Sequence, residues 1–174
     1  MILGDLGYDV ESEEMSKTAE RWLSVLYEYA NGREVDFGFT TFDNPDYDEM
    51  IVEKDITFHS LCAHHLVPFT GVSHVAYIPD KKICGLSKLA RAVDHFSHQL
   101  GNQEKITIDI ANYLEKELEP VGVAVVIQAQ HFCMSMRGVR KPGVYTTTSA
   151  IKGAFREEQT GARTEFMSLI NGGR

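Results

Sequence analysis

The sequence has little cysteine, proline and tryptophan: its 174 residues include three Cys, five Pro and one Trp. Three widely spaced cysteines, Cys62, Cys84 and Cys133, cannot supply the disulfide framework of a small secreted protein, and they favour metal-binding or packing roles in a reducing compartment. No apolar run reaches the roughly 20 residues that a membrane-spanning helix needs. The opening stretch MILGDLGYDV also lacks the basic and apolar regions of a signal peptide, so we expect a cytoplasmic protein without membrane contact.

Positive charge is also scarce, because 17 Lys and Arg residues stand against 25 Asp and Glu residues, and the formal net charge is -8. Such a balance argues against a surface that binds nucleic acid or an anionic membrane. A small anion can still be bound where a few cations gather locally. The length and the 43% share of hydrophobic residues fit one compact domain better than two.

Hydrophobic periodicity predicts a mixture of helices and strands. Apolar residues recur at intervals of three and four where helices are expected, over residues 15–30, 86–100, 106–118 and 164–170. Alternating and β-branched stretches predict strands over residues 51–61, 71–80, 121–138 and 144–153. Residues 37–50 are rich in turn formers and acidic side chains and are expected to form an irregular connection. The order of helix, two strands, two helices and two strands favours an α+β fold with antiparallel hairpins.

The segment SLCAHHLVPF, residues 60–69, gathers one cysteine and two histidines within four positions. Cys62 and His65 have the C-x-x-H spacing that lets two side chains of one tight loop reach the same metal ion. Alone, the pair is a weak indication, because a buried cysteine often acts as a small hydrophobic residue and a lone histidine often satisfies a hydrogen bond in the core. Both interpretations stay open at this point.

A third ligand is available in the segment QHFCMSMRG, residues 130–138. If this segment continues the preceding strand, alternate side chains project from one face, namely His131, Cys133, Ser135 and Arg137. A neutral core would not accommodate Arg137, so this face is expected to belong to a site. Cys84 differs, because its apolar neighbours in KKICGL predict a packing role.

Two cysteines and a histidine leave the fourth position of a tetrahedral zinc ion open for water, which is the arrangement of catalytic rather than structural zinc. Zinc lowers the pKa of its bound water toward neutrality and so makes hydroxide available as a nucleophile. Cys62, His65 and Cys133 are therefore candidate zinc ligands. His64 and His131 are candidates for moving protons beside the ion.

The stretch GLSKLAR, residues 85–91, opens a predicted helix with a hydroxyl and two cations. Ser87, Lys88 and Arg91 lie within its first turns, where they could bind an anion near a helix N-terminus. An ordinary solvated basic face explains the same residues. Glu104, with Gln103 just before it, is either an acid favoured by the dipole at a helix start or a carboxylate that accepts two N–H bonds from a guanine edge.

Four segments together resemble the signature segments of the GTP cyclohydrolase I family: SLCAHHLVPFTG, YIPDKKICGLSKLAR, NQEKIT and HFCMSMRGV. The resemblance extends to SKTAERWLSVL, which is similar to the N-terminal helix of that family, and to FREEQTGARTEFMSLI near the C-terminus. It covers nearly the whole chain, and several separate motifs in the same order make it specific for the family.

The resemblance implies the tunnelling fold, in which an N-terminal helix precedes an antiparallel ββααββ core. Subunits of this fold join their sheets into a pentameric barrel, two rings stack into a homodecamer, and the active sites lie at subunit interfaces. It also implies one domain over residues 1–174, with a helical extension and connection at 1–50 and a catalytic core at 51–174.

The resemblance further implies a zinc-dependent reaction on GTP. Water attacks C8, the imidazole ring opens, formate leaves, and the ribose carbons rearrange and reclose to give 7,8-dihydroneopterin triphosphate. That product begins the synthesis of tetrahydrofolate and other pterins or of 7-deazapurines.

Roles within this reaction are carried over by position. Cys62, His65 and Cys133 match the zinc ligands of the family. His64 and His131 match its proton-transfer histidines, and Ser87 matches the residue placed at the ribose. The residues that match its substrate-binding groups are Glu104, with Gln103 beside it, at the guanine and Lys88, Arg91 and Arg137 at the triphosphate.

Two departures from the family pattern stand close to these residues. Ala63 occupies a position where the family usually has glutamate, and Gly101-Asn102 occupies the place of its usual Gln-Val. Neither departure removes a ligand. They leave two alternatives to the cyclohydrolase: a relative that acts on another purine nucleotide, and a homologue that only binds GTP.

Overall fold

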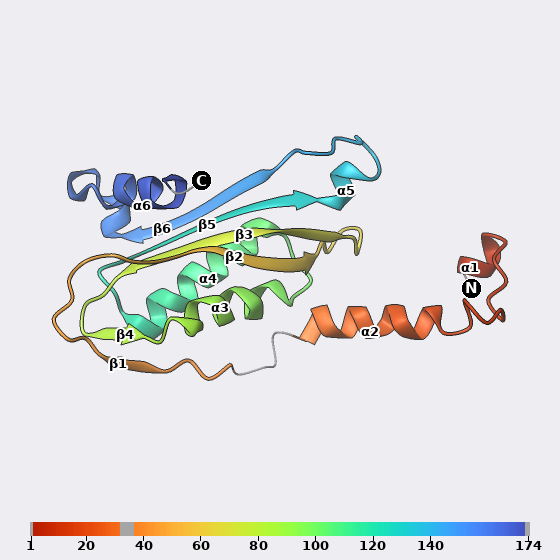
Figure 1. Ribbon diagram of the computed structural model, residues 1–174, viewed down its shortest axis with the longest axis horizontal. Helices are drawn as coiled ribbons and strands as arrows, with labels where there is room; N and C mark the ends of the chain where they lie inside the picture. The colour runs from red at the N-terminus through yellow and green to blue at the C-terminus, as the bar shows by residue number, and fades with distance from the viewer. Residues whose placement is uncertain (1, 32–36, 173–174) are drawn as a thin grey trace.

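The structure is a computed structural model that describes residues 2–31 and 37–172 (Figure 1). Its helices are α1 (Ile2–Asp5), α2 (Thr18–Ala30), α3 (Ser87–Ser97), α4 (Gln103–Leu118), α5 (Phe132–Ser135) and α6 (Ala162–Asn171), with 3-10 turns η2 (Ala154–Arg156) and η3 (Glu158–Thr160). Its strands are β1 (Thr41–Asp43), β2 (Ile51–Leu61), β3 (Pro68–Ile78), β4 (Lys82–Cys84), β5 (Gly122–His131) and β6 (Thr146–Gly153). Within the described residues, no helix has the length and apolar character needed to span a membrane.

The centre of the fold is a four-stranded antiparallel sheet with the strand order β2-β3-β5-β6. β2 and β3 form a hairpin in which Ser60 pairs with Phe69. β3 then pairs with β5, and this register sets Phe69 opposite His131 at one end of the sheet and Ile78 opposite Gly122 at the other. We call these the Phe69 end and the Ile78 end of the sheet.

Helices cover both faces of this sheet, because the side chains of each strand alternate between the two sides. α3 and α4 lie on one face, where Val75, Tyr77 and Leu89 belong to the main core (Figure 1). α6 and η2 cover part of the other face through a smaller cluster around Phe155 and Phe166. The sheet is therefore the middle layer, and its Phe69 end is less covered on the α6 side (Figure 1).

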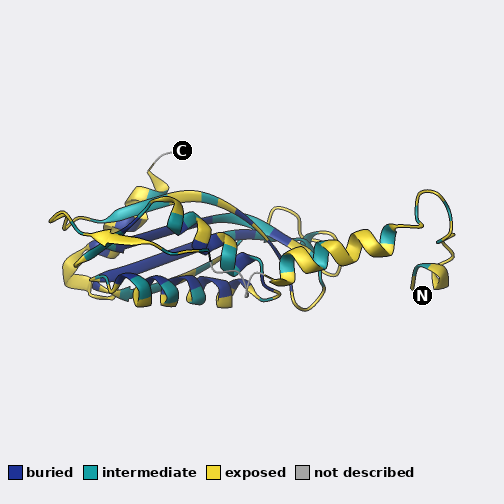
Figure 2. Cartoon of the chain, turned by 90° about the horizontal axis from the view of Figure 1, so that it is seen from below, coloured by how far each residue is buried: buried dark blue, intermediate teal, exposed yellow. Residues whose placement is uncertain are grey.

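The N-terminal part of the chain lies outside this core. α2 projects away from the sheet, and none of its residues is buried (Figure 2). Its side chains Trp22, Leu23 and Tyr27 are 44%, 52% and 65% exposed. Because large apolar side chains in water are unfavourable, a helix with this surface is suited to packing against another protein surface.

The predicted α+β fold with antiparallel hairpins is confirmed. The helix expected over 106–118 begins earlier, at Gln103, because the Asn102 side chain accepts a hydrogen bond from the Lys105 N–H at 2.9 Å and so caps the helix. The prediction of an irregular connection over 37–50 is wrong in one part, since β1 pairs with β4 there. That pairing is between distant segments, which local sequence patterns do not reveal.

The packing role predicted for Cys84 agrees with its position. Cys84 is 6% exposed, and its N–H donates a hydrogen bond to the Tyr77 hydroxyl at 3.2 Å. Burial raises the pKa of the Cys84 thiol, so this side chain stays a neutral, weakly polar part of the core.

β3 and β5 lie too close together at Gly71 for a side chain, which allows a test of the fold. A Cβ atom at this position would lie 1.9 Å from Gln128 O and 2.6 Å from Ala129 Cα, so Gly71→Ala has to push two paired strands apart. We expect this variant to lose about 1–3 kcal/mol of stability, the usual cost of overpacking. Thermal unfolding of the variant beside Gly85→Ala, whose new Cβ would meet only Lys88 Cγ at 3.9 Å, measures the effect. Equal unfolding temperatures for the two variants would contradict it.

Candidate metal and active site

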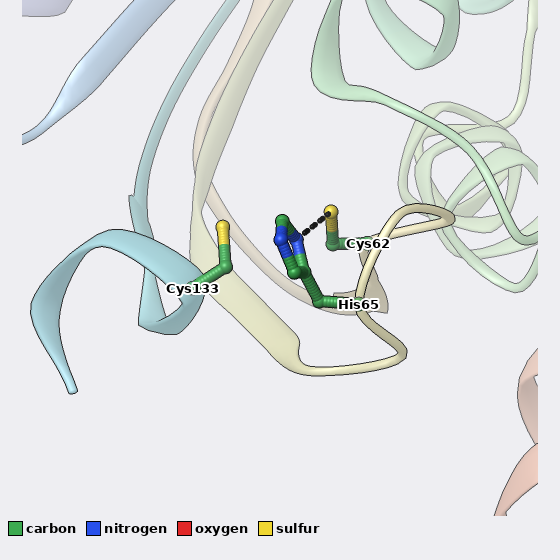
Figure 3. A group of neighbouring side chains, drawn as sticks. All are labelled: Cys62, His65 and Cys133. Carbon is green, nitrogen blue, oxygen red and sulfur yellow. Dashed lines mark hydrogen bonds between the residues drawn. The ribbon is translucent and has the colours of Figure 1, made fainter. Parts of the chain in front are cut away.

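Cys62 and His65 are brought together by the tight turn that links β2 to β3. The Cys62 carbonyl accepts hydrogen bonds from the N–H groups of His65 and Leu66, at 3.3 and 2.8 Å, and the Cys62 N–H donates to Val67 O at 3.0 Å. Leu66 closes the turn with a left-handed backbone, at a φ of 52°. As a result, Cys62 Sγ lies 3.8 Å from His65 Nδ1 (Figure 3).

Cys133 approaches the same point from α5, the single helical turn that follows β5. Figure 3 shows its sulfur on the far side of the His65 ring from the sulfur of Cys62. The potential ligand atoms of the three residues all lie within 4.8 Å of one another. The β3–β5 register explains this meeting, because it places the end of β5 beside the start of β3.

The expected extended conformation of residues 130–138 holds for Gln130 and His131 and is wrong beyond them. β5 ends at His131, and the next four residues form α5, in which the Met136 N–H donates to Phe132 O at 3.0 Å. Side chains on a helical turn do not alternate between two faces, so the strand argument that grouped His131, Cys133, Ser135 and Arg137 fails. Cys133 reaches the site because the turn redirects the chain.

The chemistry of the three donors fits a divalent metal ion such as zinc. Burial raises the pKa of the Cys133 thiol, and the neighbouring Cys62 raises it further. Two thiols this close resist ionising together unless a cation lies near both of them. Thiolate and imidazole are the ligands that zinc prefers, and a set of three leaves one position open.

A hollow of about 230 Å³ lies at this end of the sheet, and the three candidate ligands line it together with His64, His131 and Glu104. His64 is exposed, and its Nδ1 lies 3.7 Å from Cys62 Sγ. Glu104 is exposed in the first turn of α4. Two imidazoles and a carboxylate thus line the same hollow as the candidate ligands, a combination that can donate, accept and hold protons.

His131 is the most constrained of these titratable groups. Its ring stacks on Phe69, with centroids 4.6 Å apart and an angle of 4° between the planes, and its Nε2 lies 2.8 Å from Gln103 Oε1. Burial lowers the pKa of His131, while the charge of Glu104 opposes this shift. Sequence reasoning missed Phe69, because only the strand register places it opposite His131.

Gln103 also lines the hollow, but as a buried side chain and not as an exposed substrate contact. It is 1% exposed, and its amide nitrogen lies 3.1 Å from Ile127 O and 3.0 Å from both Thr146 O and Thr148 Oγ1. Because its amide oxygen faces His131, both ends of the side chain have protein partners. Glu104, the next residue, is the one that turns outward.

Ser87, Lys88 and Arg91 do not join this hollow within one subunit. They follow β4, whose Cys84 contacts Tyr77 near the Ile78 end of the sheet. Tyr77 and Phe69 are eight residues apart on β3, which corresponds to about 26 Å at the usual rise of a strand. The Lys88 ammonium donates a hydrogen bond to Gly38 O at 2.6 Å, and Arg91 lines a separate hollow beside α2.

Arg137 and the two positions that depart from the family pattern, Ala63 and Gly101-Asn102, lie around the edge of the site. Arg137 is exposed, and its charge lowers the pKa of Cys133, which places the guanidinium near the candidate ligands although it does not line the hollow. Ala63 is exposed, and its N–H donates to Gly101 O at 3.1 Å. The Gly101-Asn102 pair therefore has structural roles, since Gly101 binds the ligand turn and Asn102 caps α4.

Three nitrogen and sulfur ligands beside imidazoles and a carboxylate, on an α+β scaffold, define a candidate metal-dependent enzyme site. The profile of the family described as GTP cyclohydrolase I matches residues 1–171. The chain therefore belongs to the GTP cyclohydrolase I family, and it is a hydrolase.

Individual relatives match this chain along nearly its full length. The chain is 50% identical over 172 residues to GTP cyclohydrolase 1 of a Sulfurihydrogenibium species, which covers 98% of this chain and 90% of that protein. It is 49% identical over 173 residues to GTP cyclohydrolase 1 of Aquifex aeolicus, with 99% and 92% covered. The corresponding protein of Parabacteroides distasonis is 46% identical over 177 residues, with 99% and 89% covered.

A solved structure with a similar fold is the archaeosine synthase QueF-Like in its apo form, with a TM-score of 0.50. It is 17% identical, and the match covers 60% of this chain and 94% of that one. At this identity the likeness concerns the fold alone.

The geometry of the three ligands predicts that the metal depends on Cys133. We expect Cys133→Ser to keep the fold but to lose tight metal binding, because a hydroxyl replaces one of the two thiolates. Metal analysis after dialysis, with Cys84→Ser as a matched control far from the site, checks the prediction. Undiminished metal in Cys133→Ser would remove this residue from the ligand set.

Proposed function

We propose that this chain carries out the zinc-dependent hydrolysis of GTP, with release of formate and rearrangement to 7,8-dihydroneopterin triphosphate. The observation that carries the proposal is the convergence of Cys62, His65 and Cys133 within 4.8 Å, beside a hollow that also holds His131 and Glu104. The family to which the chain belongs supports GTP as the substrate.

The proposed zinc site uses two thiolates and one imidazole, from Cys62, Cys133 and His65. When bound there, zinc would supply a water molecule of lowered pKa. His64 and His131 lie beside these ligands and transfer protons to and from the purine ring as it opens. Glu104 accepts two N–H bonds from the guanine edge, which orients the ring that is to be opened.

The triphosphate end of the substrate needs cations. Among the residues that the structure describes, no Lys or Arg lines the hollow, and its volume of about 230 Å³ is below the roughly 300–1,000 Å³ typical of ligand pockets. We therefore propose that a neighbouring subunit contributes Ser87 at the ribose and Lys88 and Arg91 at the phosphates. Arg137, close to Cys133, would complete this cluster from the same subunit as the metal ligands.

The chain would then be one domain over residues 1–174, with the segment 1–50 extending from a core over 51–174. We propose a homodecamer of two pentameric rings in the cytoplasm, with GTP as the small-molecule partner. Its product would enter the synthesis of tetrahydrofolate and other pterins or of 7-deazapurines.

The direct test is to incubate the zinc-loaded protein with GTP. We expect a pterin that becomes fluorescent after oxidation and dephosphorylation, and we expect formate in equal amount. Cys133→Ser serves as the matched control and should form neither product, because it lacks a metal ligand.

Other results would favour the alternatives. Tight binding of GTP without product would indicate a homologue that only binds the nucleotide, and Ala63 would then be the first position to examine. Product from another purine nucleotide, but not from GTP, would indicate a relative with a different substrate.

The sheet predicts an oligomer. β2 pairs only with β3 and β6 only with β5 among the described strands, so both outer strands present unpaired backbone groups. Joining β2 of one subunit to β6 of the next closes a ring without free edges, and α2 offers additional apolar surface. We expect light scattering at micromolar concentration to give the mass of several subunits. A monomer mass under these conditions would contradict the ring.

A further inference from the structure

Gln103 connects the proposed active site to the centre of the fold. Its amide nitrogen faces two backbone carbonyls, Ile127 O at 3.1 Å and Thr146 O at 3.0 Å. A carbonyl oxygen accepts hydrogen bonds and cannot donate them, so the nitrogen of the amide, not its oxygen, has to face the strands. These two contacts determine which end of the Gln103 side-chain amide is the nitrogen and which is the oxygen.

The oxygen of the same amide consequently faces His131. Gln103 Oε1 lies 2.8 Å from His131 Nε2, and because an amide oxygen only accepts, Nε2 must carry the hydrogen. In a neutral imidazole with hydrogen on Nε2, the lone pair is on Nδ1. Among the described residues, no other hydrogen bond to this ring is found, so Nδ1 is left for the hollow that His131 lines.

Phe69 holds this arrangement in place, and two threonines lie beside the amide. Phe69, which is 0% exposed, stacks on the His131 ring and sets its plane. The Thr107 hydroxyl donates to Gln103 O at 2.7 Å and lies 2.7 Å from Thr148 Oγ1, which itself contacts the Gln103 amide nitrogen. Reversing the imidazole would therefore leave a buried amide oxygen without its donor, which is unfavourable.

We propose that Gln103 is a positioning residue for this reaction: it does not contact the nucleotide but holds His131 with hydrogen on Nε2, so that Nδ1 is the nitrogen that exchanges protons with the substrate. The role of His131 in exchanging protons with the substrate rests on the proposed function. The position of the hydrogen on its ring does not depend on whether the protein turns over GTP. Glu104, exposed beside it, remains the side chain that binds the base.

The tautomer can be measured in the wild-type protein. Nitrogen NMR of the assembled, zinc-loaded protein carrying labelled histidine, at pH 8 where the imidazole is neutral, distinguishes hydrogen on Nε2 from hydrogen on Nδ1. Comparison with His131→Gln identifies the signal of this ring. We expect hydrogen on Nε2 in the wild type and a mixture of both forms in Gln103→Met. Hydrogen on Nδ1 in the wild type would overturn the proposal, whether or not the protein turns over GTP.

Kinetics separate a positioning role from substrate binding. We expect Gln103→Met to lower kcat at least about 10-fold, up to the roughly 10²- to 10⁴-fold that a positioned acid or base contributes. Its KM for GTP should stay within about 2-fold of wild type, because no contact with the substrate is removed. Glu104→Gln provides the contrast and should raise KM. A raised KM with unchanged kcat in Gln103→Met would make Gln103 a substrate contact and overturn the proposal.

Thr148→Val controls for a merely structural effect. It removes one partner of the Gln103 amide nitrogen but keeps both backbone carbonyls and the bond to His131. We expect its kcat to remain near that of wild type even where its thermal stability falls. A loss of kcat in Thr148→Val as large as in Gln103→Met would assign the effect to strand packing instead. If wild-type protein shows the Nε2 tautomer but no turnover, the proposed function fails and the positioning geometry stands.

Discussion

The pairing of β3 with both β2 and β5 is the constraint on which the rest of the site depends. In this register Phe69 lies between Ser60 and His131, so the turn after β2 and the turn after β5 are adjacent at one end of the sheet. Cys62 and Cys133 belong to these two turns. A shift of the β3–β5 register by one residue would move every side chain of the shifted strand to the opposite face and separate the donors.

The length of the same strand explains why the candidate metal ligands and the cations at the start of α3 lie apart within one subunit. β3 is 11 residues long, about 36 Å, and it separates the end that holds the candidate ligands from the end where α3 begins. A nucleotide cannot reach both ends of one sheet. Unpaired outer strands and the exposed apolar side chains of α2 make association of subunits favourable, and association can bring the start of one α3 beside the metal end of another sheet.

Burial at the start of α4 links stability to chemistry. A polar side chain such as Gln103 can be buried only where all its hydrogen-bonding groups find partners. Here these partners are backbone carbonyls of two strands, the Thr148 hydroxyl and the His131 ring. The Asn102 cap and the contact of Gly101 with the ligand turn belong to the same region. The departure at Gly101-Asn102 thus maintains the backbone around the candidate site.

The sequence by itself determined the features that depend on near neighbours in the chain: the amphipathic helices, the strands of the central sheet, the buried role of Cys84 and the C-x-x-H pair. It could also place Cys133 among the ligand candidates, but through an argument from strand alternation that the helical turn of α5 contradicts, because a single turn is too short to produce a periodic pattern. Only the tertiary structure decided that Gln103 is buried, that Phe69 stacks on His131, that β1 pairs with β4 and that Lys88 and Arg91 lie outside the hollow of the candidate ligands. Each of these depends on strand register or on partners distant in the chain, and a local pattern of side chains carries no record of such partners.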